Sequence, residues 1–385
     1  MNIISARAIR LKAPLDTPYR TTFQTMTHRQ AVLVMLTDER GLTGVGETYI
    51  NFPLWAATGR MAAYREAFFP MVVGHDIEDP GAFTRDMWRR LYRAALQGGC
   101  IGSTLQALSA VSTALWDLSA KREGVPLSRL FSDNPAEKVR IYASGINPPL
   151  PTEAIRDALD MGMEVFKLKL GFGKETDTEN IRALKTLIGD ARVAVDVNRS
   201  WRFDEAVEWL GRLGNMDIAW VEEPLAPEDE HRYPELVELA GIPVSAGENF
   251  ILPPGSDFVS TGRDGLSLNG TRLAVDIVQP AVVKNCCFDD GVRFALFAET
   301  REKLVYPHFL GSAPGMAASA HLAALTRNPH LEWDINPNPL RTDCFTMPFR
   351  GRDGFLAIPD TPGIGWEISP EMLDQWTVDS VDVHA

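Results

Sequence analysis

The sequence predicts an α/β protein, a modified TIM-type (β/α) barrel joined to an α+β domain on its N-terminal side. From about residue 139, short apolar runs alternate with amphipathic stretches of helical length, which is typical of parallel strands and the helices that connect them. Residues 1–50 instead alternate apolar and polar positions, and the spacing then turns helical up to about residue 123. This earlier pattern indicates an antiparallel sheet covered by helices.

Length and charge narrow the class of protein. At 385 residues the chain fits two domains, a barrel and a smaller one. Its net charge of −13 argues against nucleic acid and anionic membranes as partners. We find no basic region followed by a long apolar core at the N-terminus and no 18-residue apolar run, so we expect a cytoplasmic protein. The four cysteines form no Cys-x-x-Cys pair and are expected to be reduced thiols.

The N-terminal domain should contain two segments that do not fit a strand or a helix. Strands are expected at 3–11 and 31–37, and the segment 17–28 between them is too long for a hairpin turn. A second irregular stretch, 49–55, presents aromatic and aliphatic side chains in a loop. Long loops of this kind are often functional. Helices are expected at 62–69, 82–96 and 103–121.

The barrel should consist of eight strand-and-helix units. We expect the strands at 139–143, 165–170, 192–197, 218–222, 243–246, 277–279, 303–306 and 331–334. The helices expected between them include 152–162, 177–189, 203–213, 232–240, 288–300 and 312–326. Residues 255–274, rich in Gly, Ser and Asp, are interpreted as an insertion before the sixth strand. The expected division is a capping domain at 1–125, the barrel at 126–345, and a tail at 346–385 that returns to the capping domain.

Two lysines lie two residues apart on the second expected barrel strand. Lys167 and Lys169 therefore point to the same side of the strand, which in a barrel is the interior. Each ammonium group should lower the pKa of the other, and a nearby divalent cation should lower both, so that a lysine could take a proton at neutral pH. The alternative is a solvent-facing pair on an edge strand, but Phe166, Leu168 and Leu170 favour a strand buried on both faces.

Three carboxylates end three successive barrel strands. Glu222 lies 26 residues after Asp196, and Glu248 lies a further 26 residues on, which is about one strand-and-helix unit each time. Carboxylates at matching heights on neighbouring strands repel one another, and a divalent cation relieves that repulsion. Ligation by oxygen alone predicts Mg²⁺, or Mn²⁺, rather than zinc. The alternative interpretation is that the three acids cap separate helices.

These motifs together resemble those of the enolase superfamily, specifically its mandelate racemase-like group, the mandelate racemase/muconate lactonizing enzyme family. The matching signals are Lys-x-Lys at 167–169, Asp-x-Asn at 196–198, Glu-Glu-Pro at 222–224 and Gly-Glu-Asn at 247–249. The resemblance covers nearly the whole chain and implies that the carboxylates of the three strand ends bind magnesium. It further implies that Lys169 is the base and that Lys167 stabilises the substrate carboxylate.

The same resemblance implies roles for three further residues. His308, in Val-Tyr-Pro-His-Phe after the seventh strand, matches the catalytic histidine of the family. Glu332, on the eighth strand, matches the acid that hydrogen-bonds the substrate carboxylate in the intermediate. Asn198 would lie beside the metal and support its ligands.

The chain departs from the family pattern after the sixth barrel strand. Family members usually carry Gln-Pro-Asp there, and the Asp pairs with the histidine, whereas this chain has Ala281 in its place. The usual double glycine is replaced by two cysteines at 286–287. Asp276 lies deeper in the strand and is interpreted as structural, while Lys284 lies further along the chain, from where it could reach the site. We therefore expect His308 to lack its carboxylate partner and to be less basic, and a packed histidine without a catalytic role is the alternative.

The resemblance implies removal of the proton alpha to a carboxylate, and the fate of the resulting intermediate decides the reaction. Because racemisation needs two competent bases, dehydration of a hydroxy acid or acid sugar to a 2-keto acid is favoured over racemisation, epimerisation or cycloisomerisation. A non-catalytic relative that binds a carboxylate is the alternative from another class. The expected partners are a small carboxylate substrate and further copies of the chain. Specificity should depend on Arg20, which could meet a distal carboxylate, and on Phe52 and Trp55, which suggest an apolar wall.

Overall fold

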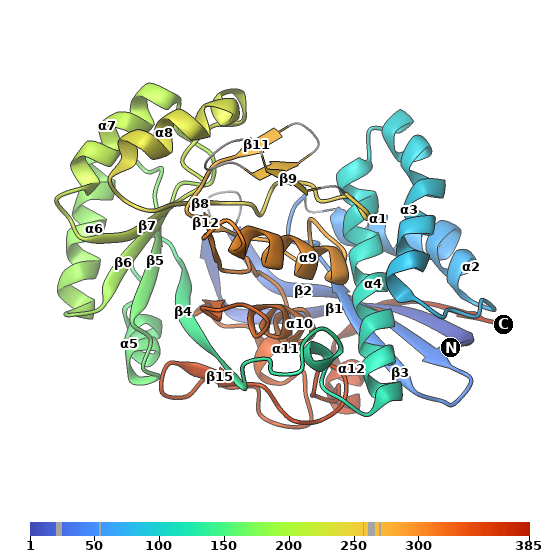
Figure 1. Cartoon of the computed structure of the whole chain (residues 1–385). Helices are drawn as coiled ribbons and strands as arrows, with labels where there is room; N and C mark the ends of the chain where they lie inside the picture. The colour runs from blue at the N-terminus through green and yellow to red at the C-terminus, as the bar shows by residue number, and fades with distance from the viewer. Residues whose placement is uncertain (21–24, 54, 257, 261–265, 269–270) are drawn as a thin grey trace.

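The computed structural model describes the 385-residue chain except residues 21–24, 54, 257, 261–265 and 269–270. Figure 1 shows a barrel with its helices on one side of the molecule and an antiparallel sheet with helices of its own on the other. The predicted fold class, a modified barrel with an α+β capping domain, is confirmed.

Eight parallel strands form the barrel sheet in the order β13-β12-β8-β7-β6-β5-β4-β14. Their bounds are β4 Lys138–Ile146, β5 Val165–Lys169, β6 Arg192–Asp196, β7 Ile218–Glu222, β8 Val244–Ala246, β12 Ile277–Val278, β13 Leu304–Val305 and β14 His330–Asp334. The sequence predicts all eight. Glu332 on β14 lies opposite Tyr142 on β4, so the last strand of the barrel lies beside the first.

The helices of the barrel bury apolar residues against the sheet. They are α5 Thr152–Asp160, α6 Lys174–Ile188, α7 Phe203–Leu213, α8 Tyr233–Ala240, α9 Phe288–Glu299 and α10 Ala313–Ala323. In α6 the buried residues Ile181, Leu184 and Ile188 recur at spacings of three and four, which places them on one face. α10 differs because it is buried along its whole length and packs against β3 of the capping domain.

An aromatic cluster fills the barrel interior below the carboxyl ends of the strands. Tyr142, Trp220 and Tyr306 are buried there beside Ala194 and Ile277. The Trp220 ring lies edge-on to Tyr142 at 5.2 Å and to Tyr306 at 5.6 Å between ring centroids. Because this layer excludes water from below, charged side chains above it must find partners within the protein.

The capping domain contains a four-stranded antiparallel sheet in the order β16-β1-β2-β3. Its strands are β1 Ile3–Arg20, β2 Thr25–Asp38, β3 Thr43–Thr48 and β16 Thr377–His384. Its helices are α1 Ala56–Ala63, α2 Phe69–Val72, α3 Pro80–Gln97 and α4 Ile101–Glu123, with a π-helical turn at Tyr64–Phe68 between α1 and α2. Leu11, Ala13, Ala31 and Leu33 belong to the barrel core, so one face of this sheet packs on the barrel.

The expected irregular segment 17–28 is corrected by the structure. β1 continues to Arg20 and β2 begins at Thr25, and the two strands pair up to Arg20 and Thr25 after a register shift between Pro14 and Tyr19. Strand pairing therefore extends well beyond the apolar cores that the sequence pattern identifies, because backbone hydrogen bonds do not require apolar side chains. Residues 21–24 of the expected loop lie outside the described residues.

The insertion and the tail each add short strands. In the insertion, β9 Phe258–Ser260, β10 Leu266–Leu268 and β11 Thr271–Leu273 form a small antiparallel sheet that the sequence pattern did not predict. In the tail, β15 Phe355–Ala357 pairs with β4 and β16 pairs with β1. The remaining elements are the short helices α11 Pro339–Thr342 and α12 Pro370–Trp376 and 3₁₀ turns at Leu127–Leu130 and Pro227–Arg232. Within the described ranges, no helix has both the length and the apolar character needed to cross a membrane.

Two glycines let β3 lie directly on α4. A Cβ added at Gly46 would be 2.0 Å from the carbonyl oxygen of Ala110, and one at Gly44 would be 2.0 Å from that of Ala114. Only hydrogen fits at these positions, because the obstructing atoms are backbone. The close approach fixes the strand that carries Glu47, a buried acid considered below.

We predict that Gly46→Ala destabilises the protein by roughly 2–4 kcal/mol, because α4 must move away from β3 to admit the methyl group. The matched control is Gly59→Ala in α1, where an added Cβ would meet nothing within 4 Å. That control should be neutral or stabilise by up to about 1 kcal/mol, since Ala favours a helix. Urea unfolding followed by circular dichroism measures both, and equal midpoints for the two variants would contradict the packing argument.

Candidate active site

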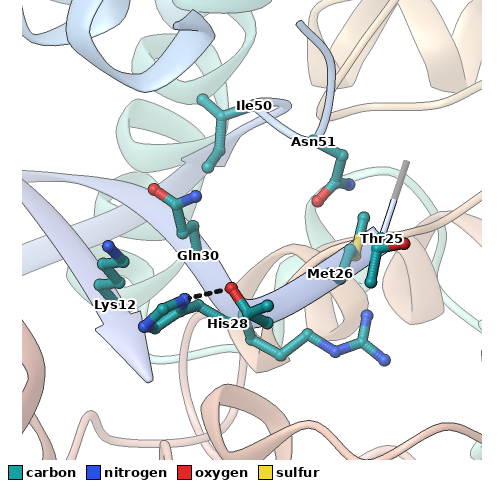
Figure 2. Close-up of a pocket in the computed structure, with 9 residues that line it drawn as sticks. Lys12, Thr25, Met26, His28, Gln30, Ile50 and Asn51 are labelled. Atoms are coloured by element: carbon teal, nitrogen blue, oxygen red, sulfur yellow. Dashed lines mark hydrogen bonds between the residues drawn. The ribbon is translucent and has the colours of Figure 1, made fainter. Parts of the chain in front are cut away.

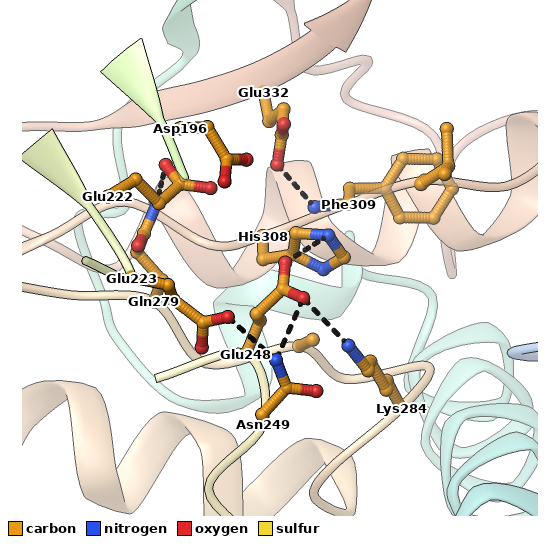
Figure 3. Close-up of polar contacts among 12 residues, drawn as sticks. Asp196, Glu222, Glu223, Glu248, Asn249, Gln279, Lys284, His308, Phe309 and Glu332 are labelled. Atoms are coloured by element: carbon orange, nitrogen blue, oxygen red, sulfur yellow. Dashed lines mark hydrogen bonds and ion pairs between the residues drawn. The ribbon is translucent and has the colours of Figure 1, made fainter. Parts of the chain in front are cut away.

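The register of the barrel strands brings the predicted charged residues together at their carboxyl ends. Lys169 lies opposite Asp196, and Asp196 lies opposite Glu222. Glu248 lies two residues beyond β8 and reaches the same end of the sheet from the turn. Figure 3 shows Asp196, Glu222, Glu248 and Glu332 around one space, with His308 among them.

Lys167 is the most deeply buried of these groups, and its side chain is 0% exposed. Its Nζ lies 2.5 Å from Glu222 Oε1, 2.7 Å from Glu332 Oε1 and 3.7 Å from Asp196 Oδ2. Burial alone would lower the pKa of Lys167, but the charges of Glu222 and Glu332 outweigh it and raise that pKa well above its ordinary value. Lys167 is therefore a fixed positive charge in this site.

Neighbouring side chains hold the two carboxylates that flank Lys167. Gln279 Nε2 donates to Glu222 Oε2 at 2.7 Å, and Trp220 Nε1 lies 3.3 Å from the same oxygen. Burial raises the pKa of Glu222 well above its usual range, and Lys167 opposes this shift. Ser144 Oγ donates to Glu332 Oε1 at 2.5 Å, so each carboxylate is bound from two sides.

Lys169 lies nearer the solvent, with 18% of its side chain exposed, and its Nζ pairs with Asp196. The predicted effect of Lys167 on its pKa is present, while the predicted effect of a divalent cation stays a prediction. Burial and Lys167 do lower the pKa of Lys169, but Asp196 with help from Glu222 and Glu248 raises it above its ordinary value. Although burial disfavours the charge of Asp196, Lys169 and Lys167 lower the pKa of that carboxyl group.

Glu248 joins two basic groups, one on each of its oxygens. His308 Nε2 lies 2.7 Å from Oε2, and Lys284 Nζ lies 2.9 Å from Oε1 (Figure 3). Burial works against the charge of Glu248, but His308 and Lys284 lower its pKa well below its usual range. Lys284 thus reaches the site, as its position in the sequence allowed, and it also lies 5.0 Å from the ring centre of Tyr49 in the capping domain.

His308 lies just beyond β13 and is held by its backbone. Its N–H donates to the Pro280 carbonyl at 3.1 Å, and the next N–H, of Phe309, donates to Glu332 Oε2 at 3.0 Å. Its buried Nδ1 has no hydrogen-bond partner within the part of the chain that the structure describes. Asp276 does not serve it, because Asp276 Oδ2 accepts from the backbone N–H of Val244, in agreement with its structural interpretation.

Some residues at the site were not singled out from the sequence. Glu223, next to Glu222, has a positive φ of 41° and is buried, and it accepts from Asn249 Nδ2 at 2.7 Å. Burial, joined by the charge of Glu248, raises the pKa of Glu223 to about 8. The adjacency of these two residues to Glu222 and Glu248 was the signal available. Asn198, which was predicted, donates its backbone N–H to Asp196 Oδ1 at 2.9 Å.

The segments predicted to set specificity meet at a pocket in the capping domain. The pocket has a volume of about 230 Å³. Figure 2 shows Lys12, His28 and Gln30 of β1 and β2 on one side of it and Ile50 and Asn51 on the other. Asn51 also binds the barrel, because its Nδ2 donates to the Leu310 carbonyl at 2.7 Å.

The three residues predicted to set specificity lie within these segments. Arg20 pairs through its backbone with Thr25 at the end of β1. Phe52 is half-buried and precedes a cis proline, and Trp55 is 73% exposed at the start of α1. Leu54, between them, lies outside the described residues.

The carboxylates fit a hard divalent cation by their chemistry. Asp196, Glu222 and Glu248 offer only oxygen donors. In addition to burial, the charge of Glu248 disfavours ionisation of Asp196, and the charge of Asp196 acts to raise the pKa of Glu222. Their oxygens face the lysines and His308, however, and no group of three acidic, histidine or cysteine side chains among the described residues gathers as a ready metal site. A cation would therefore compete with ammonium groups for the same oxygens.

A barrel of this order, a capping sheet closed by the C-terminal strand, and lysines facing acids at the strand ends define an enolase-type enzyme scaffold. Residues 152–372 match the family model "Enolase C-terminal domain-like", and residues 3–132 match that of the mandelate racemase / muconate lactonizing enzyme N-terminal domain. The chain belongs to the mandelate racemase/muconate lactonizing enzyme family of the enolase superfamily, as the sequence motifs predicted.

Relatives of the chain catalyse different reactions. It is 30% identical to a D-galactarolactone cycloisomerase of Agrobacterium fabrum, over 98% of this chain and 99% of the relative. It is 28% identical to an arabinonate dehydratase of Saccharolobus solfataricus, over 75% and 77% of the two chains. Among solved structures, a racemase from Streptomyces coelicolor with bound magnesium matches with a TM-score of 0.81 and 25% identity, over 98% of this chain and 100% of that one. These relatives are enzymes, and their reactions differ.

Proposed function

We propose that the protein removes the proton alpha to a carboxylate and then expels an oxygen from the β-carbon, most simply as the dehydration of a hydroxy acid or acid sugar to a 2-keto acid. This proposal rests on the difference between the polar partners of Lys169 and those of His308. Lys169 pairs with Asp196 and keeps 18% of its side chain exposed. His308 does have a carboxylate neighbour, since its Nε2 lies 2.7 Å from Glu248, but its Nδ1 has no partner among the described residues, and Ala281 stands where an acid is expected. An imidazole without a carboxylate on Nδ1 suits proton donation better than strong base catalysis.

Each charged residue has a proposed role. Lys169 takes the α-proton, and His308 gives a proton to the departing oxygen. Lys167 and Glu332, paired at 2.7 Å, hold the charge that develops on the substrate carboxylate, Lys167 by its positive charge and Glu332 by a hydrogen bond. Asn198 supports Asp196 through the backbone bond at 2.9 Å.

Asp196, Glu222 and Glu248 would hold Mg²⁺, with Mn²⁺ as a substitute, because their donors are all carboxylate oxygens. When bound, such a cation would supply positive charge to the substrate carboxylate and offset the acids that raise the pKa of Lys169. The first part of the proposed division, residues 1–125, would bring the pocket of Figure 2 and residues Arg20, Phe52 and Trp55 to the substrate. The other two parts of the proposed division are the barrel at 126–345 and the tail at 346–385. We also expect the chain to form a homo-oligomer.

A cycloisomerase is the second candidate, and the 30% identity with the D-galactarolactone cycloisomerase favours it. In that case the departing oxygen belongs to a ring of the substrate instead of a free hydroxyl group, and the same two proton transfers apply. A racemase or epimerase would require His308 to act as a second base. A carboxylate-binding protein without activity would exchange no α-proton.

We predict that chelation abolishes activity and that Mg²⁺ restores it, because the three acids repel one another without a cation. Glu248→Gln should weaken Mg²⁺ binding at least about tenfold, measured by titration calorimetry on the purified protein. Glu137→Gln serves as a control, since Glu137 lies in another part of the surface. Full activity in excess chelator would refute the metal assignment.

We predict that Lys169→Ala loses both exchange of the α-proton with deuterated solvent and product formation, by about 10² or more. His308→Asn should lose product formation but retain exchange on the lysine side of the substrate. Proton NMR in deuterium oxide measures both quantities in one sample. If α-proton exchange is instead lost in His308→Asn and kept in Lys169→Ala, His308 is the base and Lys169 the proton donor.

A further inference from the structure

We infer that Glu47, on β3 of the capping domain, is a positioning residue that fixes the chain segment 308–315 and with it the catalytic histidine. This inference rests on the proposed role of His308 and adds a residue to which no role at the site has been given. It makes the capping domain a part of the apparatus that transfers the second proton.

Glu47 is buried, at 3% exposure, and its carboxylate binds the start of α10 with both oxygens. Oε1 accepts the backbone N–H of Ser312 at 2.8 Å, and Oε2 accepts Ser312 Oγ at 2.7 Å and the backbone N–H of Gly315 at 2.8 Å. The N–H groups at a helix N-terminus have no partner inside the helix and favour a negative charge. The acid therefore caps a barrel helix from another domain.

The two glycines of this segment lie in close contact with the same carboxylate. A Cβ at Gly311 would lie 2.5 Å from Glu47 Oε1, and one at Gly315 would lie 2.7 Å from Oε2. The carboxylate itself cannot retreat easily, because Gly44 and Gly46 seat β3 directly on α4. Both sides of the contact are thus built for a short distance between backbone and acid.

The segment between His308 and α10 is held residue by residue. From the barrel, Glu332 accepts the N–H of Phe309 at 3.0 Å, and Asn338 Nδ2 donates to the Gly311 carbonyl at 2.8 Å. From the capping domain, Asn51 Nδ2 donates to the Leu310 carbonyl at 2.7 Å, and Glu47 binds the chain at Ser312. A shift of Glu47 would be transmitted through this short segment to His308, four residues before Ser312.

Glu47 forms no ion pair with any described residue, so burial raises its pKa and only the hydrogen bonds from Ser312 and Gly315 oppose that shift. Glu47→Gln has the same shape but turns a donor group toward at least one of the three donors. The expected result is a looser segment 308–315 in a protein that still folds.

The test compares Glu47→Gln with Asp117→Asn in the full-length protein. Asp117 is an equally buried acid that accepts backbone N–H groups, from Val45 at 2.8 Å and Ile364 at 2.6 Å, but it does not contact the segment 308–315. Hydrogen–deuterium exchange followed by mass spectrometry should show exchange of peptides covering 308–316 about tenfold or more faster in Glu47→Gln, and unchanged in Asp117→Asn. In deuterium oxide, Glu47→Gln should retain α-proton exchange by Lys169 while product formation falls about tenfold or more.

Several results would overturn the inference. The first is that amide protection of 308–316 is the same in Glu47→Gln and wild type. The second is that Asp117→Asn loses as much protection there as Glu47→Gln does. The third is that α-proton exchange and product formation fall equally in Glu47→Gln. If Glu47→Gln does not fold, Ser312→Ala removes one of the three bonds and must show the same changes at smaller size. If wild type exchanges no α-proton of any carboxylate, the proposed function fails, while the protection of 308–316 still decides the role of Glu47.

Discussion

The ammonium group of Lys167, buried between two carboxylates, is the interaction on which the rest of the site depends. It contacts Glu222 at 2.5 Å and Glu332 at 2.7 Å, and these acids come from strands far apart in the sequence. A buried charge without a partner costs several kcal/mol, so the register of β5, β7 and β14 must bring all three groups together. The same constraint explains why Ser144 donates to the Glu332 oxygen that Lys167 contacts and why Gln279 donates to the other oxygen of Glu222. It also explains the aromatic layer of Trp220 and its neighbours, which keeps water out from below.

The capping domain is bound to the carboxyl ends of the last barrel strands by polar contacts. Arg29 forms a buried ion pair with Asp334 at 2.7 Å, two residues beyond Glu332. Glu47 and Asn51 bind the segment just after His308, and the Tyr49 ring lies beside Lys284. Because all of these contacts lie next to proposed catalytic groups, the orientation of the capping domain and the geometry of the site are linked. We therefore expect changes in the capping loops to alter the substrate while the proposed proton-transfer groups of the barrel stay in place.

Local patterns in the sequence were sufficient for the barrel and for the set of charged residues at its mouth. The spacing of Asp196, Glu222 and Glu248 reports one strand-and-helix unit, and the family motifs name the same residues. Features that depend on contacts between residues far apart in the sequence could not be predicted from it. The hairpin continues to Arg20 and Thr25 because two strands meet, and Glu47 binds Ser312 across 265 residues of sequence. The pairing of Lys169 with Asp196, which raises the pKa of Lys169 against the lowering effect of Lys167, was not accessible either, because no spacing reveals how close the two side chains lie.

The central claim is that a proton leaves the α-carbon of a carboxylate and an oxygen then leaves the β-carbon. Wild-type protein with Mg²⁺, offered a panel of acid sugars and their lactones in deuterium oxide, tests it most directly when products are monitored by NMR. We expect a 2-keto product from at least one compound, with one solvent deuterium on the carbon that lost its oxygen. Inversion of the α-carbon with deuterium uptake and no 2-keto product would contradict it and establish an epimerase.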